Sequence, residues 1–101
     1  MNLDKEIVFQ LQELAKNYKI TSLVLFGSRA RGNNFPKSDI DLAVFGCEDF
    51  INFYFDCQEM IDTLLKFDIV NMDECDTNSK LFQEVKKDGV ILYAEDGQLF
   101  P

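Results

Sequence analysis

The chain has no histidine, so its 101 residues lack the commonest general base and a common zinc ligand. Its three cysteines, Cys47, Cys57 and Cys75, lie far apart and form no C-x-x-C pair. Neither a zinc site nor a disulfide framework is indicated, and we expect reduced thiols in a cytoplasmic protein. Acid–base chemistry must then come from carboxylates, lysine, tyrosine or a metal-bound water.

Positive charge is also scarce, because ten Lys and Arg residues stand against 18 Asp and Glu, giving a formal net charge of −8. Such a protein repels phosphate backbones, so nucleic acid is not expected as its main partner. The N-terminus lacks the basic start and apolar run of a signal peptide, and no stretch approaches the roughly 18 apolar residues of a membrane helix. We therefore expect no membrane association.

Apolar residues are plentiful, at 47% of the chain, and aromatic residues make up 13%. A chain of this length and composition can offset the entropy of folding and has room for one core, so residues 1–101 are expected to form a single domain. Helical and alternating apolar patterns follow one another along it, which indicates an α/β (α+β) fold. The predicted helices cover residues 3–18, 49–67 and about 78–88, the predicted strands cover residues 22–26, 38–45, 67–71 and 90–93, and the tail over 95–101 is expected to be frayed.

The first candidate site follows the first predicted strand, where Gly27 and Ser28 open a short helix. Free backbone N–H groups at such a turn form a natural cradle for phosphate, and a glycine lets the phosphate approach closely. Ser28 could donate its hydroxyl to a phosphate oxygen or could simply cap the helix. Arg29 and Arg31 could offset triphosphate charge, although a solvated arginine is the commoner case.

The second candidate site is a pair of carboxylates, Asp39 and Asp41, which alternate with Ile40 and Leu42. On a strand, residues two apart project from the same face, so the two carboxylates repel each other unless a cation lies between them. A solvated face with two solubilising acids is the alternative. Oxygen ligands beside a triphosphate suit Mg²⁺, which holds one or two carboxylates plus substrate oxygens.

Together these segments, G-S-R-A-R-G at residues 27–32 and S-D-I-D-L at residues 38–42, resemble the signature of polymerase beta-type nucleotidyltransferases. The order and spacing of both halves match, and the flanking elements fit that family's minimal fold. The resemblance implies a small mixed sheet of about four strands flanked by about three helices. Among its subgroups the chain is most similar to the minimal nucleotidyltransferase (MNT) type, which is paired with HEPN-type toxins.

The resemblance also implies a reaction centre with two Mg²⁺ ions and ATP as the substrate. Asp39, Asp41 and Asp68 would be its catalytic and metal-binding residues, with Asp68 helping to hold the second ion and activating the acceptor hydroxyl. Asp73 and Asp62 are weaker alternatives to Asp68, in an acidic loop and on the polar face of the long helix. The residues expected to bind the nucleotide are Gly27, Ser28, Arg29 and Arg31.

The function implied is transfer of AMP to a hydroxyl, with tyrosine favoured, of a HEPN-type toxin, for which the chain would be the antitoxin in a hetero-oligomer. Phe50, Tyr54 and Phe55 could supply a docking face for this partner, or could be core residues. One alternative is a non-catalytic antitoxin that neutralises its toxin by occlusion. Another is the catalytic subunit of a small-molecule nucleotidyltransferase of the aminoglycoside-modifying type.

Overall fold

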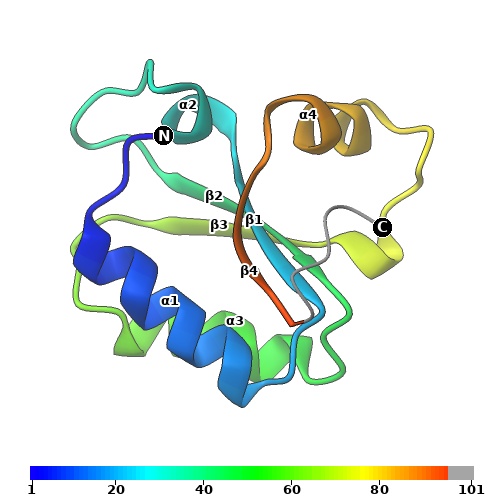
Figure 1. The fold of residues 1–101 in the computed structure, drawn as a ribbon, viewed down its shortest axis with the longest axis horizontal. Helices are drawn as coiled ribbons and strands as arrows, with labels where there is room; N and C mark the ends of the chain where they lie inside the picture. Colours follow the sequence, from blue (N-terminus) through cyan, green and yellow to red (C-terminus); the bar gives the residue numbers. More distant parts are fainter. Residues whose placement is uncertain (96–101) are drawn as a thin grey trace.

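The computed structural model describes residues 1–95, which build a four-stranded sheet with helices on both of its faces (Figure 1). The last predicted segment, the tail, lies outside the described residues except for Glu95. The elements in chain order are α1 (Lys5–Asn17), β1 (Ser22–Phe26), α2 (Gly27–Arg31), β2 (Ile40–Phe45), α3 (Phe50–Met60), β3 (Phe67–Asn71), the 3₁₀ turn η1 (Met72–Glu74), α4 (Lys80–Asp88) and β4 (Val90–Ala94).

The sheet is mixed, with the strand order β3-β2-β1-β4. β1 pairs antiparallel with both β2 and β4, whereas β2 pairs parallel with β3. A parallel pair needs a crossover connection, and α3 provides it. The mixed sheet of four strands is therefore confirmed, and three longer helices flank it together with the short α2.

Two clusters of buried side chains lie on opposite faces of the sheet. Leu23 and Leu25 of β1 pack in one cluster with α1 and α3, while Val24 and Phe26 pack in the other with α4. In Figure 1, α1 and α3 accordingly lie below the sheet and α4 above it. Because alternate residues of a strand face opposite sides, both sets of side chains in β1 meet an apolar cluster, and all five of its residues are buried.

The ends of α1 and α4 follow ordinary capping chemistry. The Asp4 carboxylate accepts a hydrogen bond from the backbone N–H of Glu6 at 2.8 Å, and the Ser79 hydroxyl accepts one from Phe82 at 3.1 Å. Lys86 and Lys87 occupy the last turn of α4 just before Gly89. These side chains satisfy N–H groups that a helix start leaves unpaired or complement the helix dipole, so both helices form close to their predicted ranges.

The prediction of one long helix over residues 49–67 is wrong at the C-terminal end, because α3 ends at Met60. Beyond it, the Thr63 N–H donates to the Ile61 carbonyl at 2.9 Å, and the Thr63 hydroxyl accepts from the Leu65 N–H at 3.1 Å. These local bonds compete with helical ones and turn the chain back toward β3. Leu64, expected inside the helix, is instead fully exposed at the turn, with a relative accessibility of 104%.

The aromatic residues expected on α3 separate into two groups. Phe50 and Tyr54 are half-buried against the cluster shared with α1, whereas Phe55 is exposed together with Ile51. The core therefore accounts for the first two. Across residues 1–95, no helix combines the length and the apolar character needed to cross a membrane.

The segment between α2 and β2 is held by one arginine. Arg29 is only 6% exposed, and its guanidinium donates to the backbone carbonyl oxygens of Ser38 at 3.0 Å, Pro36 at 3.0 Å and Asn2 at 3.2 Å. The Asn2 N–H in turn donates to the Arg29 carbonyl at 2.8 Å. Arg29 thus joins the N-terminal segment to the loop that leads into β2.

We expect Arg29→Ala to lower the free energy of unfolding by about 2–4 kcal/mol, because three backbone carbonyl groups lose a charged hydrogen-bond donor and a buried side chain is removed. Urea denaturation followed by circular dichroism measures this change. Arg31→Ala is the matched control from the same helix. Its side chain is 42% exposed and pairs with Asp88 at 3.3 Å, so its loss should cost about 1 kcal/mol or less. Equal losses for the two variants would contradict a structural role specific to Arg29.

Candidate active site

The closest contact in the candidate site is between the backbone at Gly27 and the side chain of Asp41. The strand register pairs Phe26 with Asp41, which brings this carboxylate to the turn where β1 ends and α2 begins. A Cβ atom added to Gly27 would lie 2.3 Å from Asp41 Oδ2, and Gly27 has a φ of 73°. Both the available space and the backbone conformation therefore require glycine at this position.

Asp68 lies beside Asp41 on the neighbouring strand. The two residues are direct partners in the parallel pairing of β2 with β3. Ala43 belongs to the cluster on the α4 face and Ile69 to the cluster on the α1 face. Because successive residues alternate between faces, Asp41 and Asp68 both project toward the α4 face. The structure thus brings together two carboxylates that are far apart in sequence.

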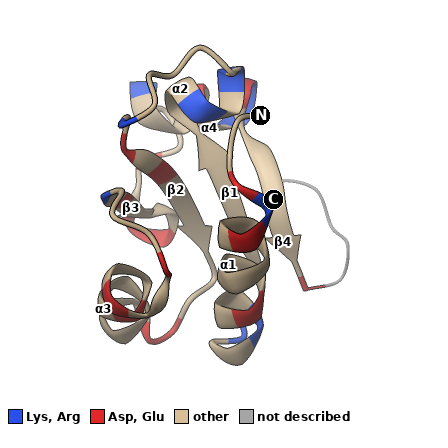
Figure 2. Cartoon of the chain, turned by 90° about the vertical axis from the view of Figure 1, so that its left-hand side faces the viewer, with Lys and Arg blue, Asp and Glu red and all other residues tan. Residues whose placement is uncertain are grey.

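Asp39 differs in one respect from its prediction. The predicted strand over residues 38–45 begins only at Ile40, whose N–H donates to the Lys66 carbonyl at 2.8 Å. Asp39 therefore lies just ahead of the strand and is exposed. Ser38 closes a turn with Phe35 instead, because the Phe35 N–H donates to its hydroxyl at 2.9 Å. Acidic segments at the start of β2 and basic segments on α2 lie at the same end of the molecule (Figure 2).

The electrostatics of the site centre on Asp41. Burial raises the pKa of the Asp41 carboxyl above its usual value, and the negative charges of Asp68 and Asp39 raise this pKa further. Arg31 opposes the shift, while Glu84 on α4 adds to it. Sequence reasoning missed Glu84, because nothing distinguishes it from other polar residues of an amphipathic helix. Its contribution follows from α4 packing over this face of the sheet.

The donor set suits a hard cation. Its atoms are carboxylate oxygens that repel one another, and a cation between them would relieve this repulsion. Within residues 1–95, no three acidic or cysteine side chains are already gathered into a closed metal cluster. Mg²⁺ uses one or two carboxylates and completes its shell with water and substrate oxygens. The residues present therefore fit this ion.

Ser28 is not the N-cap of α2. The helix begins at Gly27 and Phe26 occupies the capping position, so Ser28 lies within the first turn. Among residues 1–95, no group is hydrogen-bonded to its hydroxyl, which leaves that hydroxyl able to donate to a ligand. Of the two arginines in α2, Arg31 influences Asp41 electrostatically and is partly exposed, whereas the guanidinium of Arg29 is already engaged by three carbonyl oxygens.

The alternatives to Asp68 lie elsewhere. Asp62 follows α3 instead of lying on it, and its N–H donates to the Gln10 side-chain oxygen at 2.9 Å, on the α1 side of the molecule. Asp73 lies at the opposite end of β2 from Asp41, where both of its carboxylate oxygens are 3.0 Å from the Gly46 N–H. Neither residue is close to the turn at Gly27.

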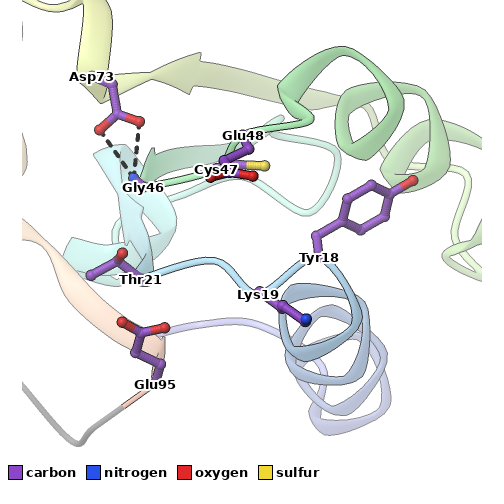
Figure 3. Close-up of a pocket in the computed structure, with 8 residues that line it drawn as sticks. All are labelled: Tyr18, Lys19, Thr21, Gly46, Cys47, Glu48, Asp73 and Glu95. Carbon is purple, nitrogen blue, oxygen red and sulfur yellow. Dashed lines mark hydrogen bonds between the residues drawn. The ribbon is translucent and has the colours of Figure 1, made fainter.

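Asp73 lines a cavity of about 500 Å³ at that far end of the sheet (Figure 3). Its carboxylate points at the Gly46 backbone, and the Tyr18 side chain points toward α3, where its hydroxyl donates to Asp56. The cavity has three acidic side chains and only one basic side chain, that of Lys19. It therefore offers little to a phosphate.

A comparison with known families identifies the family of the chain. The family model described as "Polymerase beta, Nucleotidyltransferase" matches residues 10–98, which is most of the chain. The chain belongs to the polymerase beta nucleotidyltransferase family. The matched range includes the Gly27 turn and all three carboxylates. Family membership makes the chain a nucleotidyltransferase, as the sequence predicted.

Relatives of this nucleotidyltransferase have been named individually. It is 36% identical over 104 residues to the protein adenylyltransferase MntA of Aphanizomenon flos-aquae, covering 89% of this chain and 67% of that protein. A crystal structure of a toxin–antitoxin with AMP-PNP superposes with a TM-score of 0.68 at 23% identity, over 90% of this chain and 74% of the other. A structure of the toxin–antitoxin MntA–HpeT mutant superposes with a TM-score of 0.68 at 22% identity, over 86% of this chain and 73% of the other. At these identities the two structures support the fold alone.

Two glycines with positive φ provide a test of the Gly27 contact. Gly27→Ala should lower the free energy of unfolding by about 2–5 kcal/mol, because it combines backbone strain with overlap on Asp41. Gly32→Ala should cost only about 1–2 kcal/mol, since Gly32 has a φ of 82° but nothing within 4 Å of an added Cβ. Chemical denaturation of both variants measures the difference. In an Asp41→Ala background the cost at Gly27 should fall to the Gly32 value; an unchanged cost would rule out the steric clash.

The raised pKa of Asp41 predicts a pH-dependent stability difference. Above this pKa the ionised carboxylate destabilises the folded state, so Asp41→Asn should melt at a higher temperature than the wild type in metal-free buffer at pH 7. The gap should narrow as pH falls through the pKa, because the wild-type carboxyl is then neutral too. Thermal melts of both proteins between pH 3 and 8, in steps of about one pH unit, measure this difference in melting temperature.

Glu13→Gln is the control, because it removes an exposed carboxylate on α1, at the other face of the sheet. Its melting temperature should follow that of the wild type across the whole pH range. Excess Mg²⁺ should raise the melting temperature of the wild type and of Glu13→Gln more than that of Asp41→Asn. A wild type that is more stable than Asp41→Asn without metal would contradict the repulsion described above.

Proposed function

We propose that this nucleotidyltransferase transfers AMP from ATP to a hydroxyl, with tyrosine the favoured acceptor, of a HEPN-type toxin and thereby acts as its antitoxin. The observation that carries the proposal is the packing of the Asp41 carboxylate against the Gly27 turn, with Asp68 directly beside it. A phosphate seated at this turn would lie next to the acidic cluster. The similarity to a protein adenylyltransferase supports AMP as the group transferred.

Each residue of the site has a proposed role. Gly27 and Ser28 receive the triphosphate, the first through its accessible backbone and the second through its free hydroxyl. Arg31 adds positive charge at the same place, whereas the Arg29 guanidinium binds backbone carbonyl oxygens and positions the loop ahead of Asp39. Asp39, Asp41 and Asp68 hold the two Mg²⁺ ions. When bound, Mg²⁺ neutralises charge on the phosphate oxygens.

The reaction is an in-line displacement at the α-phosphorus. The acceptor oxygen forms a bond to that phosphorus while the bond from phosphorus to the oxygen leading to the β-phosphate breaks, and pyrophosphate leaves. The hydroxyl proton passes to the carboxylate of Asp68, which is exposed on β3 and so open to an incoming acceptor. Orientation and preorganised charge supply most of the rate acceleration.

A partner and a compartment complete the proposal. Two structural neighbours are toxin–antitoxin assemblies, one of them with a nucleotide analogue, which supports a toxin as the acceptor in a hetero-oligomer. The cysteines at 47, 57 and 75 are free thiols, in agreement with a reducing, cytoplasmic setting. The retained carboxylates and glycine turn favour catalysis over simple occlusion of the toxin.

The test is intact-mass spectrometry of the HEPN-type protein encoded beside this chain, after incubation with the chain, ATP and Mg²⁺. We expect the partner to gain whole AMP units. Asp41→Asn should reduce the rate about 100-fold or more, because the neutral side chain would no longer hold the Mg²⁺ that offsets charge on the phosphate oxygens, whereas Glu13→Gln should retain the wild-type rate. A stable complex without any mass gain would reject the transferase role and leave an antitoxin that acts by occlusion.

A further inference from the structure

A groove of about 490 Å³ opens beside Asp39 and is not explained by the nucleotide site. Its walls come from the residues just ahead of β2 and just ahead of β3, two segments joined by the hydrogen bond from the Ile40 N–H to the Lys66 carbonyl. Asp39 belongs both to this groove and to the acidic cluster. The residues lining the groove are Lys37, Asp39, Leu64, Leu65 and Lys66.

The position of the groove follows from the strand order. Gly27 and Ser28 follow β1, the acidic pair belongs to β2, and the groove continues toward β3 at the edge of the sheet. In an in-line displacement the attacking oxygen approaches opposite the leaving pyrophosphate. If the triphosphate lies at the Gly27 turn, on the β1 side of the carboxylates, the acceptor must approach from the β3 side. The groove lies along that approach.

The groove's chemistry suits a polypeptide. Leu64 has a relative accessibility of 104%, and Leu65 is half-buried against the core, so together they offer an exposed apolar surface on a fixed base. Lys37 and Lys66 are exposed at the same groove, in a chain whose net charge is −8. No aromatic ring lines the groove within residues 1–95, so it offers no stacking surface for a nucleobase.

We propose that this groove binds the acceptor polypeptide, taking the residues next to the modified hydroxyl. The bound segment would carry an apolar side chain to cover Leu64 and Leu65, and a carboxylate to pair with Lys37 or Lys66. This proposal rests on the proposed function. It adds a location and a sequence preference for the acceptor, and it makes these residues determinants of specificity for the protein substrate.

The test compares Leu64→Glu and the double variant Lys37→Glu/Lys66→Glu with the wild type. These side chains are exposed, so the changes should leave the melting temperature nearly unaltered. Initial rates of AMP transfer are measured at varied concentrations of the HEPN-type partner, and ATP binding with Mg²⁺ is measured by calorimetry. We expect the KM for the partner to rise about 10-fold in each variant, with ATP affinity within about twofold of the wild type.

Two matched controls come from α1, away from the groove. Phe9→Glu changes an exposed apolar residue, and the double variant Lys5→Glu/Lys16→Glu reverses two exposed lysines. Both should keep the wild-type KM for the partner. A rise in KM that is as large in the controls would mean that net charge, and not the groove, governs recognition, and would overturn the proposal.

Other outcomes separate this proposal from the function on which it rests. If the groove variants lose ATP affinity in step with activity, the groove belongs to the nucleotide and the proposal is wrong. Binding of the partner to each variant is also measured by calorimetry. If the KM for the partner and this binding affinity equal those of the wild type, the groove binds no acceptor. A wild type that binds the partner without modifying it rejects the transferase function, and partner affinity in the same variants then decides whether the groove is still the contact.

Discussion

The contact between the Asp41 carboxylate and the Gly27 backbone is the constraint around which the site is built. It requires the antiparallel register that pairs Phe26 with Asp41, a glycine with positive φ at the end of β1, and a helix that starts at once. Each of these in turn requires β1 to lie in the centre of the sheet, buried on both faces. The two apolar cores therefore serve to hold one carboxylate against one turn.

That carboxylate is unfavourable for the fold that holds it. Burial and the neighbouring charges of Asp39 and Asp68 raise the pKa of Asp41, so the ionised site stores repulsion that a cation can release. Residues arranged for stability alone would not be placed in this way. A cation-binding site of the kind proposed would explain the arrangement, because functional sites commonly lower the stability of the fold that carries them.

Local patterns predicted much of this structure, including the range of β1, the approximate range of α4 and the glycine turn. What they could not predict depends on contacts between distant segments. The pairing of Asp68 with Asp41 is set by the register of β2 on β3, and only the family resemblance indicated it. Helical spacing at Ile61 and Leu65 predicted a longer α3, because the same apolar residues also suit a turn that packs on the core. Arg29 was assigned to the nucleotide since its carbonyl acceptors, such as Asn2, are invisible to spacing.

The double link between Asn2 and Arg29 has a practical consequence. Because the N-terminal segment is hydrogen-bonded to α2, and Arg29 also holds the loop ahead of Asp39, the first residues are part of the support of the site. An affinity tag fused directly to Met1 would lie beside that loop and could strain it. Protein made for kinetic work should carry a flexible spacer there, or have the tag removed, before a low rate is attributed to the enzyme.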